Sequence, residues 1–250
     1  MFAAKSLIVV GLLFAAGSVR AEECKPPHCE EQSDAEADFN HDQTAAVKTV
    51  GKTMKQPSND IDTLRHSAKI AKAKLMEVLA AALTKSHCSK VKVGPIKGMD
   101  RIKEKIATDK SSPALVWDYA RATLVCPTYC KALAAKALLK DDLGKGLGFT
   151  EVRTKDLFLA PAPTGYRAFM LNGKPGNLSM IVEVQVQVAS LDVLYKDAHK
   201  YYEIVRSPHS SAEEKKTAEA HVKKMYDDAW HKVAVAEKLH TDNAGVHCGK

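Results

Sequence analysis

Apolar residues recur at helical spacing in two long stretches of this chain, one early and one near its C-terminal end. Between Asp60 and about His87 they fall three or four positions apart, as on a helix with one buried face. A second stripe follows Ser211, where a Ser-x-x-Glu sequence ending at Glu214 is typical of a helix N-terminus. The pattern therefore predicts two long amphipathic helices. Their apolar positions are Ile61, Leu64, Ala68, Ala71, Leu75, Val78 and Ala82 in the first, and Ala218, Val222, Met225, Ala229, Val233 and Ala236 in the second.

Shorter helical and extended patterns alternate between these two helices. Helical spacing covers Met99–Thr108, the alanine-rich stretch Pro127–Lys140 and Asp192–Arg206. Helices before, among and after strands predict an α+β fold, in which a mixed sheet of about five strands is flanked by helices and followed by a long C-terminal helix. The strands, rich in β-branched and aromatic residues, are expected at Val91–Ile96, within Val116–Val125, and at Phe149–Phe158, Tyr166–Leu171 and Leu178–Val188.

The first 21 residues have the layout of a secretory signal peptide. Lys5 precedes an apolar run over 7–17, and small residues surround Ala21. The run is too short to span a bilayer, which needs about 20 apolar residues. We therefore expect cleavage after Ala21 and a secreted protein.

Charge divides the rest of the chain into two parts. The whole sequence of 250 residues has a net charge of +7, yet residues 22–60 hold nine acidic and four basic side chains. Residues 61–250 therefore hold 31 basic against 21 acidic side chains. We expect a disordered acidic leader over 22–59 and a basic domain over 60–250. A basic domain favours phosphate-bearing ligands, although a soluble surface with extra lysines is equally consistent with the charge.

The six cysteines all follow the expected cleavage point. An even number of cysteines in an exported protein favours disulfides. Sequence alone leaves 15 ways of pairing them. Cys24 with Cys29 is locally plausible, and so is Cys88 with Cys248. Their spacing matches no common zinc finger, and the chain lacks Walker A, GxSxG and HExxH motifs.

Three charged residues are suited to phosphate and metal chemistry. Lys97 and Lys105 lie near a turn that opens a predicted helix, where lysines and the helix N-terminus can hold phosphates. Asp118 is a lone acidic residue in an apolar segment. Each has a plainer interpretation as well: the lysines can form a solvated helix face, and the aspartate can cap a turn.

Two further stretches lie on the later strands. A proline-rich loop leads into Tyr166, which can be an ordinary hairpin aromatic. In Ile181–Val188 valines alternate strictly with polar residues, so Glu183, Gln185 and Gln187 share one face of a strand. That face can also be the wet side of an antiparallel sheet.

The order of these stretches resembles the RelA/SpoT family of nucleotide pyrophosphokinases, the alarmone synthetases. The family's first loop, R-x-K-x-x-x-S-I-x-x-K, aligns with Pro95–Lys105, and its aspartate on an apolar segment aligns with Asp118. Its K-D-Y-I-x-x-P-K-x-N-G-Y loop aligns with Lys155–Tyr166, and its E-V-Q strand with Glu183–Gln185. The resemblance extends over about residues 91–206.

The resemblance implies a nucleotidyltransferase-like sheet and an Mg²⁺-dependent reaction. The β,γ-pyrophosphate of ATP would pass to the 3′-hydroxyl of a nucleotide, as in guanosine tetraphosphate or pentaphosphate synthesis, or to an RNA 3′ end such as that of tRNA. Asp118 and Glu183 would bind Mg²⁺. Lys97, Lys105 and Arg121 would hold the ATP phosphates. The expected catalytic residues are thus Asp118, Glu183, Lys105 and Lys97.

The resemblance also implies an acceptor side. Tyr166 would stack on the acceptor base, supported by Lys155 and Gln185. Arg167, next to the tyrosine, and His199, on a helix that resembles the family's closing helix, are further nucleotide-binding candidates.

The chain departs from the family's pattern in several places. Asp118 is followed by Tyr-Ala-Arg-Ala-Thr in place of the usual D-x-x-G-x-R. Pro95 stands for an arginine, Ala162 for a lysine, Ala168 for a serine and Met170 for a histidine. The arginine and the histidine normally contact phosphates. Two functions therefore stay open: an exported pyrophosphokinase, or a catalytically silent secreted domain that binds a nucleotide or a protein partner.

Overall fold

The computed structural model describes residues 29–31, 54–109, 111–141, 148–207, 209–242 and 245–249. The expected signal peptide, and with it the question of secretion, lies outside these residues, as does most of the expected leader. None of the helices in the described part is long and apolar enough to cross a membrane.

The centre of the molecule is a six-stranded mixed sheet with the order β1-β2-β3-β6-β5-β4. The central pair, β3 and β6, is parallel, as are β1 and β2, and the other neighbours are antiparallel. This confirms the mixed sheet of the predicted α+β fold. The strands are β1 (Cys29–Glu31), β2 (Lys90–Val93), β3 (Arg121–Cys126), β4 (Phe149–Asp156), β5 (Phe169–Pro175) and β6 (Val182–Val188).

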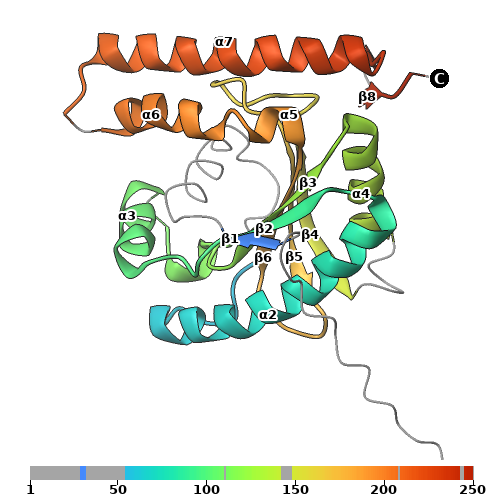
Figure 1. The fold of residues 1–250 in the computed structure, drawn as a ribbon. Helices are drawn as coiled ribbons and strands as arrows, with labels where there is room; N and C mark the ends of the chain where they lie inside the picture. The colour runs from blue at the N-terminus through green and yellow to red at the C-terminus, as the bar shows by residue number, and fades with distance from the viewer. Residues whose placement is uncertain are drawn as a thin grey trace, which may run out of the picture.

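Helices cover both faces of this sheet (Figure 1). One face packs against α2 (Ile61–Ser86) and α4 (Tyr129–Asp141), and α3 (Met99–Asp109) lies to the side. On the other side of the sheet, α5 (Ala189–Asp192) leads to α6 (Tyr195–Arg206), which lies alongside α7 (Ala212–Ala236). A small hairpin of β7 (His240–Asp242) and β8 (Gly245–His247), which the sequence pattern did not predict, follows α7.

The two long helices begin where the sequence predicts. The Asp60 carboxylate accepts a hydrogen bond from the backbone N–H of Thr63 at 2.7 Å, which caps α2. At the start of α7 the Ser211 hydroxyl accepts from the backbone N–H of Glu214 at 3.2 Å, and the Glu214 carboxylate accepts from the backbone N–H of Ser211 at 2.7 Å. This reciprocal pair confirms the predicted capping box.

Three strands begin later than their sequence patterns predict. Pro113–Leu115 forms a 3-10 turn, so the strand expected within Val116–Val125 begins only at Arg121. The strands expected from Tyr166 and from Leu178 likewise begin later, at Phe169 and Val182. The residues that these strands leave out form the loops in which the candidate site lies.

Strand β6 is buried on both faces, so the interpretation of Glu183, Gln185 and Gln187 as the wet side of a sheet is wrong. Their exposed fractions are 1%, 1% and 2%. The reason is the layer formed by α5, α6, α7 and the loop after β4, which covers this face. Burying three polar side chains in a row is costly unless they are hydrogen-bonded or bind a ligand, which directs attention to this face.

The described disulfides join Cys88 to Cys126 and Cys130 to Cys248. The pairing of Cys88 with Cys248, given above as plausible, is therefore wrong. Cys88 lies two residues before β2, which runs antiparallel to β3, so it comes close to Cys126 at the end of β3. Cys24 with Cys29 lies outside the residues whose side chains are described.

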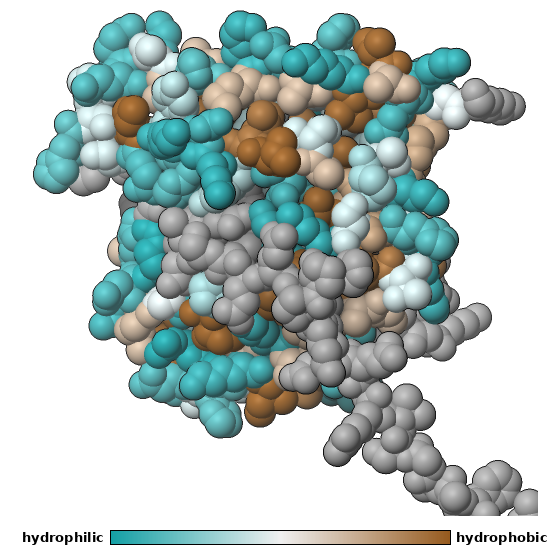
Figure 2. Space-filling view, in the orientation of Figure 1, coloured by the Kyte–Doolittle hydropathy of each residue, from teal (hydrophilic) through white to brown (hydrophobic). Residues whose placement is uncertain are grey.

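The surface is mostly hydrophilic in the orientation of Figure 1, with apolar residues in small groups (Figure 2). Such scattered residues are normal on a soluble domain. Among the described residues, the most exposed of the large apolar side chains are those of Val193, Val235 and Ile70.

Candidate active site on the polar face of the sheet

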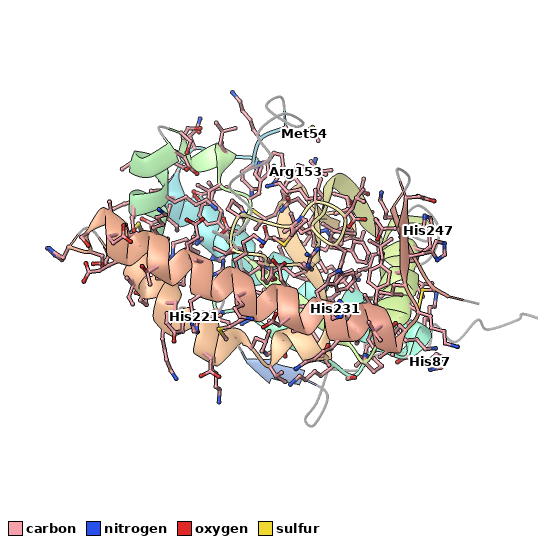
Figure 3. The ribbon with its side chains drawn as sticks, turned by 90° about the horizontal axis from the view of Figure 1, so that it is seen from above. Met54, His87, Arg153, His221, His231 and His247 are labelled. Carbon is pink, nitrogen blue, oxygen red and sulfur yellow. A yellow bond between two sulfur atoms is a disulfide. The ribbon has the colours of Figure 1, made fainter. Side chains whose placement is uncertain are left out.

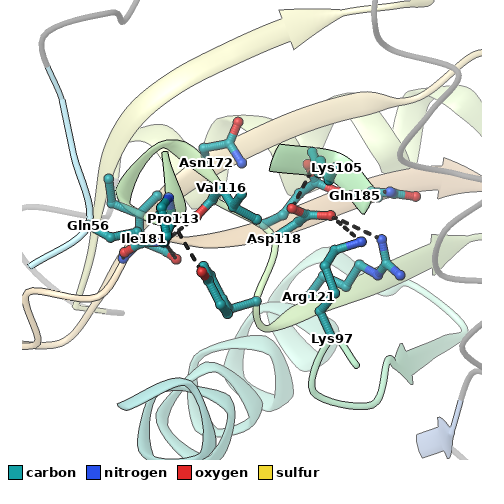
Figure 4. A network of polar contacts seen from close by, with 12 residues as sticks. Gln56, Lys97, Lys105, Pro113, Val116, Asp118, Arg121, Asn172, Ile181 and Gln185 are labelled. Atoms are coloured by element: carbon teal, nitrogen blue, oxygen red, sulfur yellow. Dashed lines mark hydrogen bonds and ion pairs between the residues drawn. The ribbon is translucent and has the colours of Figure 1, made fainter. Parts of the chain in front are cut away.

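Asp118 is the centre of a buried ionic cluster just before β3 (Figure 4). One carboxylate oxygen lies 3.0 Å from Nζ of Lys105. The other lies 3.1 Å from Nζ of Lys97 and 3.4 Å from Nη1 of Arg121. Only 1% of Asp118 is exposed. Three predicted phosphate-binding cations therefore converge on the predicted metal ligand.

The backbone fixes where these cations come from. Lys105 lies on α3, and Lys97 lies in the turn before it, where its backbone N–H donates to the carbonyl of Tyr119 at 3.0 Å. Arg121 is the first residue of β3. The turn, the helix and the strand thus each bring one basic side chain to Asp118, although these residues are well separated in the sequence.

Glu183 stands beside this cluster on the neighbouring strand. It is the register partner of Arg121 on β3 and of Asn172 on β5. Its backbone N–H also donates to the carbonyl of Ala120 at 3.1 Å. The two predicted metal ligands, Asp118 and Glu183, are thereby carried by adjacent, hydrogen-bonded segments at the centre of the sheet.

The register continues this row to the edge of the sheet, since Asn172 is paired with Arg153 on β4. Residues paired in this way share one face of the sheet. Nε and Nη2 of Arg153 donate to Oδ1 of Asn172 at 3.2 and 2.7 Å. The guanidinium also lies over the ring of Trp117, 4.6 Å from its centroid. In the view from above, Figure 3 shows Arg153 to one side of α7.

A second row of residues lies two positions further along each strand on the same face of the sheet. In it, Lys155 is paired with Met170, and Met170 is paired with Gln185. Burial is the main cause that lowers the pKa of Lys155 to about 8, and the positive charge of Arg153 adds to it. The negative charge of Glu183 acts in the opposite direction. Burial likewise lowers the pKa of Arg153. Both cations are therefore held where their charge is costly.

The polar face carries more positive than negative charge. Two carboxylates, Asp118 and Glu183, are surrounded by five basic side chains. Two of these basic side chains are buried and three are partly buried, so their excess positive charge costs free energy that an anionic ligand would lower. The five are Lys97, Lys105, Arg121, Arg153 and Lys155.

Gln185 links Tyr166 to Glu183. The hydroxyl of Tyr166 lies 2.9 Å from Oε1 of Gln185 and donates to it, because Nε2 of Gln185 donates to Glu183 at 3.1 Å. The ring of Tyr166 is completely buried, edge-on to Tyr226 of α7, with centroids 5.7 Å apart. Tyr166 is therefore linked to Glu183 through Gln185 and can help to orient its carboxylate. Stacking of its buried ring on a nucleotide base would require α7 or the loop between β4 and β5 to move.

Two of the predicted residues have their described contacts elsewhere. Arg167 donates to the carbonyl of Phe158 and to Asp227 of α7, each at 3.1 Å, and so ties the loop after β4 to α7. His199 lies on α6, with Nε2 3.3 Å from a carboxylate oxygen of Glu203. Neither contact belongs to the cluster around Asp118.

Three residues near the cluster were missed by sequence reasoning: Arg153, Asn172 and Trp117. Arg153 could have been found, because it precedes Lys155 by two positions on a strand and so shares its face. Asn172 needed the register of β5. Nδ2 of Asn172 and Nε1 of Trp117 have no hydrogen-bond partner within the described structure, although both atoms are buried.

The donor set fits Mg²⁺. This hard cation takes oxygen ligands and is usually held by one or two carboxylates together with substrate phosphates. Asp118 and Glu183 supply two carboxylates, and no larger cluster of His, Cys, Asp or Glu exists within the described residues. The lysines now paired with Asp118 would move to the phosphates that arrive with the metal.

Comparison with known proteins supports the fold. No family model and no curated protein matches the sequence. Among solved structures, small alarmone synthetase 2 from Bacillus subtilis is similar at 18% identity with a TM-score of 0.57, covering 70% of this chain and 95% of that one. Small alarmone synthetase 1 from the same organism, bound to its product pppGpp, matches at 16% identity and a TM-score of 0.55, covering 70% and 91%.

A third similar structure is the complex between the type VI effector Tas1 and its immunity protein. It matches at 21% identity and a TM-score of 0.51, covering 74% of this chain and 100% of that chain. At these identities the likeness shows the fold alone. The chain has the fold of the small alarmone synthetases, as the resemblance of its motifs implied.

Proposed function

We propose that this protein is an exported, Mg²⁺-dependent nucleotide pyrophosphokinase. It transfers the β,γ-pyrophosphate of ATP to the 3′-hydroxyl of an acceptor nucleotide or of an RNA 3′ end. The observation that carries this proposal is the excess of buried and partly buried cations around the buried carboxylates Asp118 and Glu183. A polyphosphate is the ligand that offsets several positive charges at once, and the fold likeness to alarmone synthetases supports the same chemistry.

On the donor side, Lys97, Lys105 and Arg121 bind the ATP phosphates. Asp118 and Glu183 would hold the metal, and a bound Mg²⁺ would supply positive charge to neutralise the transferred group. The O3′ of the acceptor forms a bond to the β-phosphorus as the bond from that phosphorus to the α,β-bridging oxygen breaks. AMP leaves, and the hydroxyl proton is released. Catalysis is mainly positioning and charge neutralisation.

On the acceptor side, Lys155 and Arg153 provide positive charge next to Glu183. Gln185, held by Tyr166, keeps the Glu183 carboxylate oriented. Arg153 and Nδ2 of Asn172, which has no described partner, offer donors on the same face as Met170, which replaces a phosphate-contacting histidine of the family's pattern. Their presence favours an active site over a silent one.

The expected signal peptide and the two disulfides support export. Because ATP is scarce outside cells, we further propose that the protein acts after delivery into another cell. A mature protein found only in the cytosol of the producing cell would contradict delivery into another cell, but it would not contradict the proposed pyrophosphate transfer.

The reaction can be tested with the oxidised protein Glu22–Lys250, Mg²⁺ and γ-labelled ATP, with GDP, GTP, ADP, ATP and deacylated tRNA offered in parallel. We expect one labelled product that identifies the acceptor. Glu183→Gln should abolish it, whereas Glu213→Gln, a matched change at an exposed position of α7, should not.

The second candidate, a silent binding domain, is favoured by one observation: the complete burial of Tyr166. It predicts that nucleotide binds, as measured by calorimetry, while no acceptor yields a product. Absence of both binding and product would overturn the pyrophosphokinase and the nucleotide-binding domain together.

A further inference from the structure

Gln56 is a buried polar residue in an otherwise exposed segment. It lies before α2, with exposed Lys55 and Pro57 on either side, and only 4% of it is exposed. A buried amide in such a segment requires hydrogen-bond partners.

Its side chain joins two segments that are far apart in the sequence (Figure 4). Nε2 donates to the carbonyl of Val116 at 3.0 Å and to the carbonyl of Ile181 at 2.9 Å. Oε1 accepts from the backbone N–H of Ile181 at 2.9 Å. Both amide protons are thereby used, and the orientation of the amide is fixed, because carbonyls can only accept and an N–H can only donate.

The backbone of Gln56 adds a fourth contact, since its N–H donates to the carbonyl of Ala114 at 2.8 Å. The residue is therefore held from both its main chain and its side chain. It does not depend on α2 for its position.

The two joined segments lead directly to the two carboxylates. Val116 precedes Asp118 by two residues, and Ile181 precedes Glu183 by two residues. Direct hydrogen bonding between these segments is described only from Ala120 and Glu183 onward. Gln56 thus supplies the link that the backbones do not make for themselves.

The segment that carries Asp118 is tied on both sides of it. The hydroxyl of Tyr119 donates to the carbonyl of Pro113 at 3.2 Å, which closes the segment between them into a loop. The backbone N–H of Val116 donates to the same carbonyl at 3.2 Å, so Val116 and Asp118 belong to one hydrogen-bonded loop.

We infer that Gln56 is a positioning residue that sets the separation of Asp118 and Glu183 and so the geometry of their shared metal site. This inference rests on the proposed function. Mg²⁺ demands near-ideal octahedral geometry, so a small displacement of one carboxylate is felt at once. Loss of a group bonded directly to a metal ligand typically costs 10–100-fold in metal affinity or activity. Gln56 acts one step further out, through the backbone of Val116 and Ile181, so we expect the lower end of that range.

The test uses the oxidised Glu22–Lys250 protein with Gln56→Met, which preserves length and removes all three side-chain hydrogen bonds. Gln56→Glu, which keeps the acceptor but loses both donors, is the second variant if the first does not fold. Asn59→Ala, at an exposed neighbour, is the control. We expect a fall in kcat of about 10-fold or more and a similar rise in the half-saturating Mg²⁺ concentration, with the KM for ATP changed less than about threefold.

A second measurement separates this inference from the proposed function. In a protein without turnover, hydrogen exchange still reports whether Gln56→Met releases the backbone N–H of Glu183 together with that of Ile181, and Mn²⁺ binding reports the metal site directly. Faster exchange at both amides and about 10-fold weaker Mn²⁺ binding support the inference. Unchanged Mg²⁺ dependence, or faster exchange at Ile181 alone, would show that Gln56 only fastens the chain before α2.

Discussion

Two regions of this domain are buried to a similar degree but are built on opposite physical principles. The polar cluster around Asp118 and Glu183 gathers charges that cost free energy to bury. The aromatic corner, where Tyr129 of α4 and Trp230 of α7 meet, gathers rings at centroid distances of 4.7 to 5.9 Å. The rings of this corner are Tyr129, Phe158, Phe169 and Trp230.

Two polar groups of the aromatic corner find partners within the chain. The Glu237 carboxylate accepts from the backbone N–H groups of Tyr129 and Cys130 at 2.8 and 3.1 Å, which caps α4. The hydroxyl of Tyr129 donates to the carbonyl of Val246 at 2.8 Å. In the polar cluster, by contrast, Nδ2 of Asn172 is a buried donor with no hydrogen-bond partner in the described structure, and basic side chains outnumber carboxylates. The contacts of the corner therefore stabilise the fold, whereas the charges of the cluster cost free energy to bury.

Asp118→Asn should give the largest effect, because it should lower both the activity and the stability of the protein. It removes the carboxylate shared by three buried cations, so activity should fall by at least about 100-fold. The free energy of unfolding should also fall, by about 3–5 kcal/mol, because an uncompensated charge is left buried. Denaturant titration with and without Mg²⁺ and ATP checks this. An unchanged free energy of unfolding in the variant without Mg²⁺ and ATP would contradict the claim that the Asp118 carboxylate stabilises the cations around it.

Removing the disulfide next to the aromatic corner should affect stability alone. Cys130 and Cys248 are 118 residues apart. Closing such a loop lowers the conformational entropy of the unfolded chain, which raises the free energy of unfolding by about 4–5 kcal/mol. We expect the double variant Cys130→Ala, Cys248→Ala to lose up to this amount while the folded fraction keeps its kcat. The other disulfide spans 38 residues and should contribute less. A lower kcat in the folded double variant would contradict the claim that the aromatic corner contributes to stability alone.

Tyr129→Ala should destabilise the domain by about 3–5 kcal/mol, because a fully buried ring leaves a cavity. Activity per folded molecule should stay within about threefold, since the ring lies outside the polar cluster. Kinetics well below the melting temperature, compared with Lys131→Ala at an exposed neighbouring position of α4, would test this.

The smallest effect concerns Lys155, whose pKa is lowered to about 8. The unfolded chain binds this proton more tightly than the folded one, so the stability contribution of Lys155 should rise between about pH 8 and its ordinary pKa of 10.5. Nucleotide affinity should move in the opposite direction and fall above pH 8 as the charge is lost. Lys155→Arg should flatten the affinity profile, and a profile that remains unchanged would remove Lys155 from the site.

Sequence reasoning could reach the parts of this structure that depend on local chemistry. The caps at Asp60 and Ser211 and the alternation in β6 each follow from residues within a few positions of one another. The cluster around Asp118 was within reach only through the resemblance of several motifs in order.

The parts that were missed depend on register or on long-range contact. Asn172 belongs to the polar face because of its pairing with Glu183, which no local pattern specifies. Gln56 stands in a polar stretch where nothing marks it as buried. The true partner of Cys88 became evident only from the antiparallel pairing of β2 with β3.

The two disulfides also decide how the molecule carries mechanical load. From Met54 to Gly249, the shortest covalent path runs along α2 to Cys88, crosses to Cys126, follows the chain to Cys130 and crosses to Cys248. Tension between these ends is borne by α2 and the two cross-links. The intervening loops, 89–125 and 131–247, are bypassed, and they contain Asp118, Glu183 and every cation of the polar cluster. A pull on the oxidised protein can unwind α2 but cannot draw out the sheet that carries the polar cluster, whereas the same pull after reduction extends the whole chain.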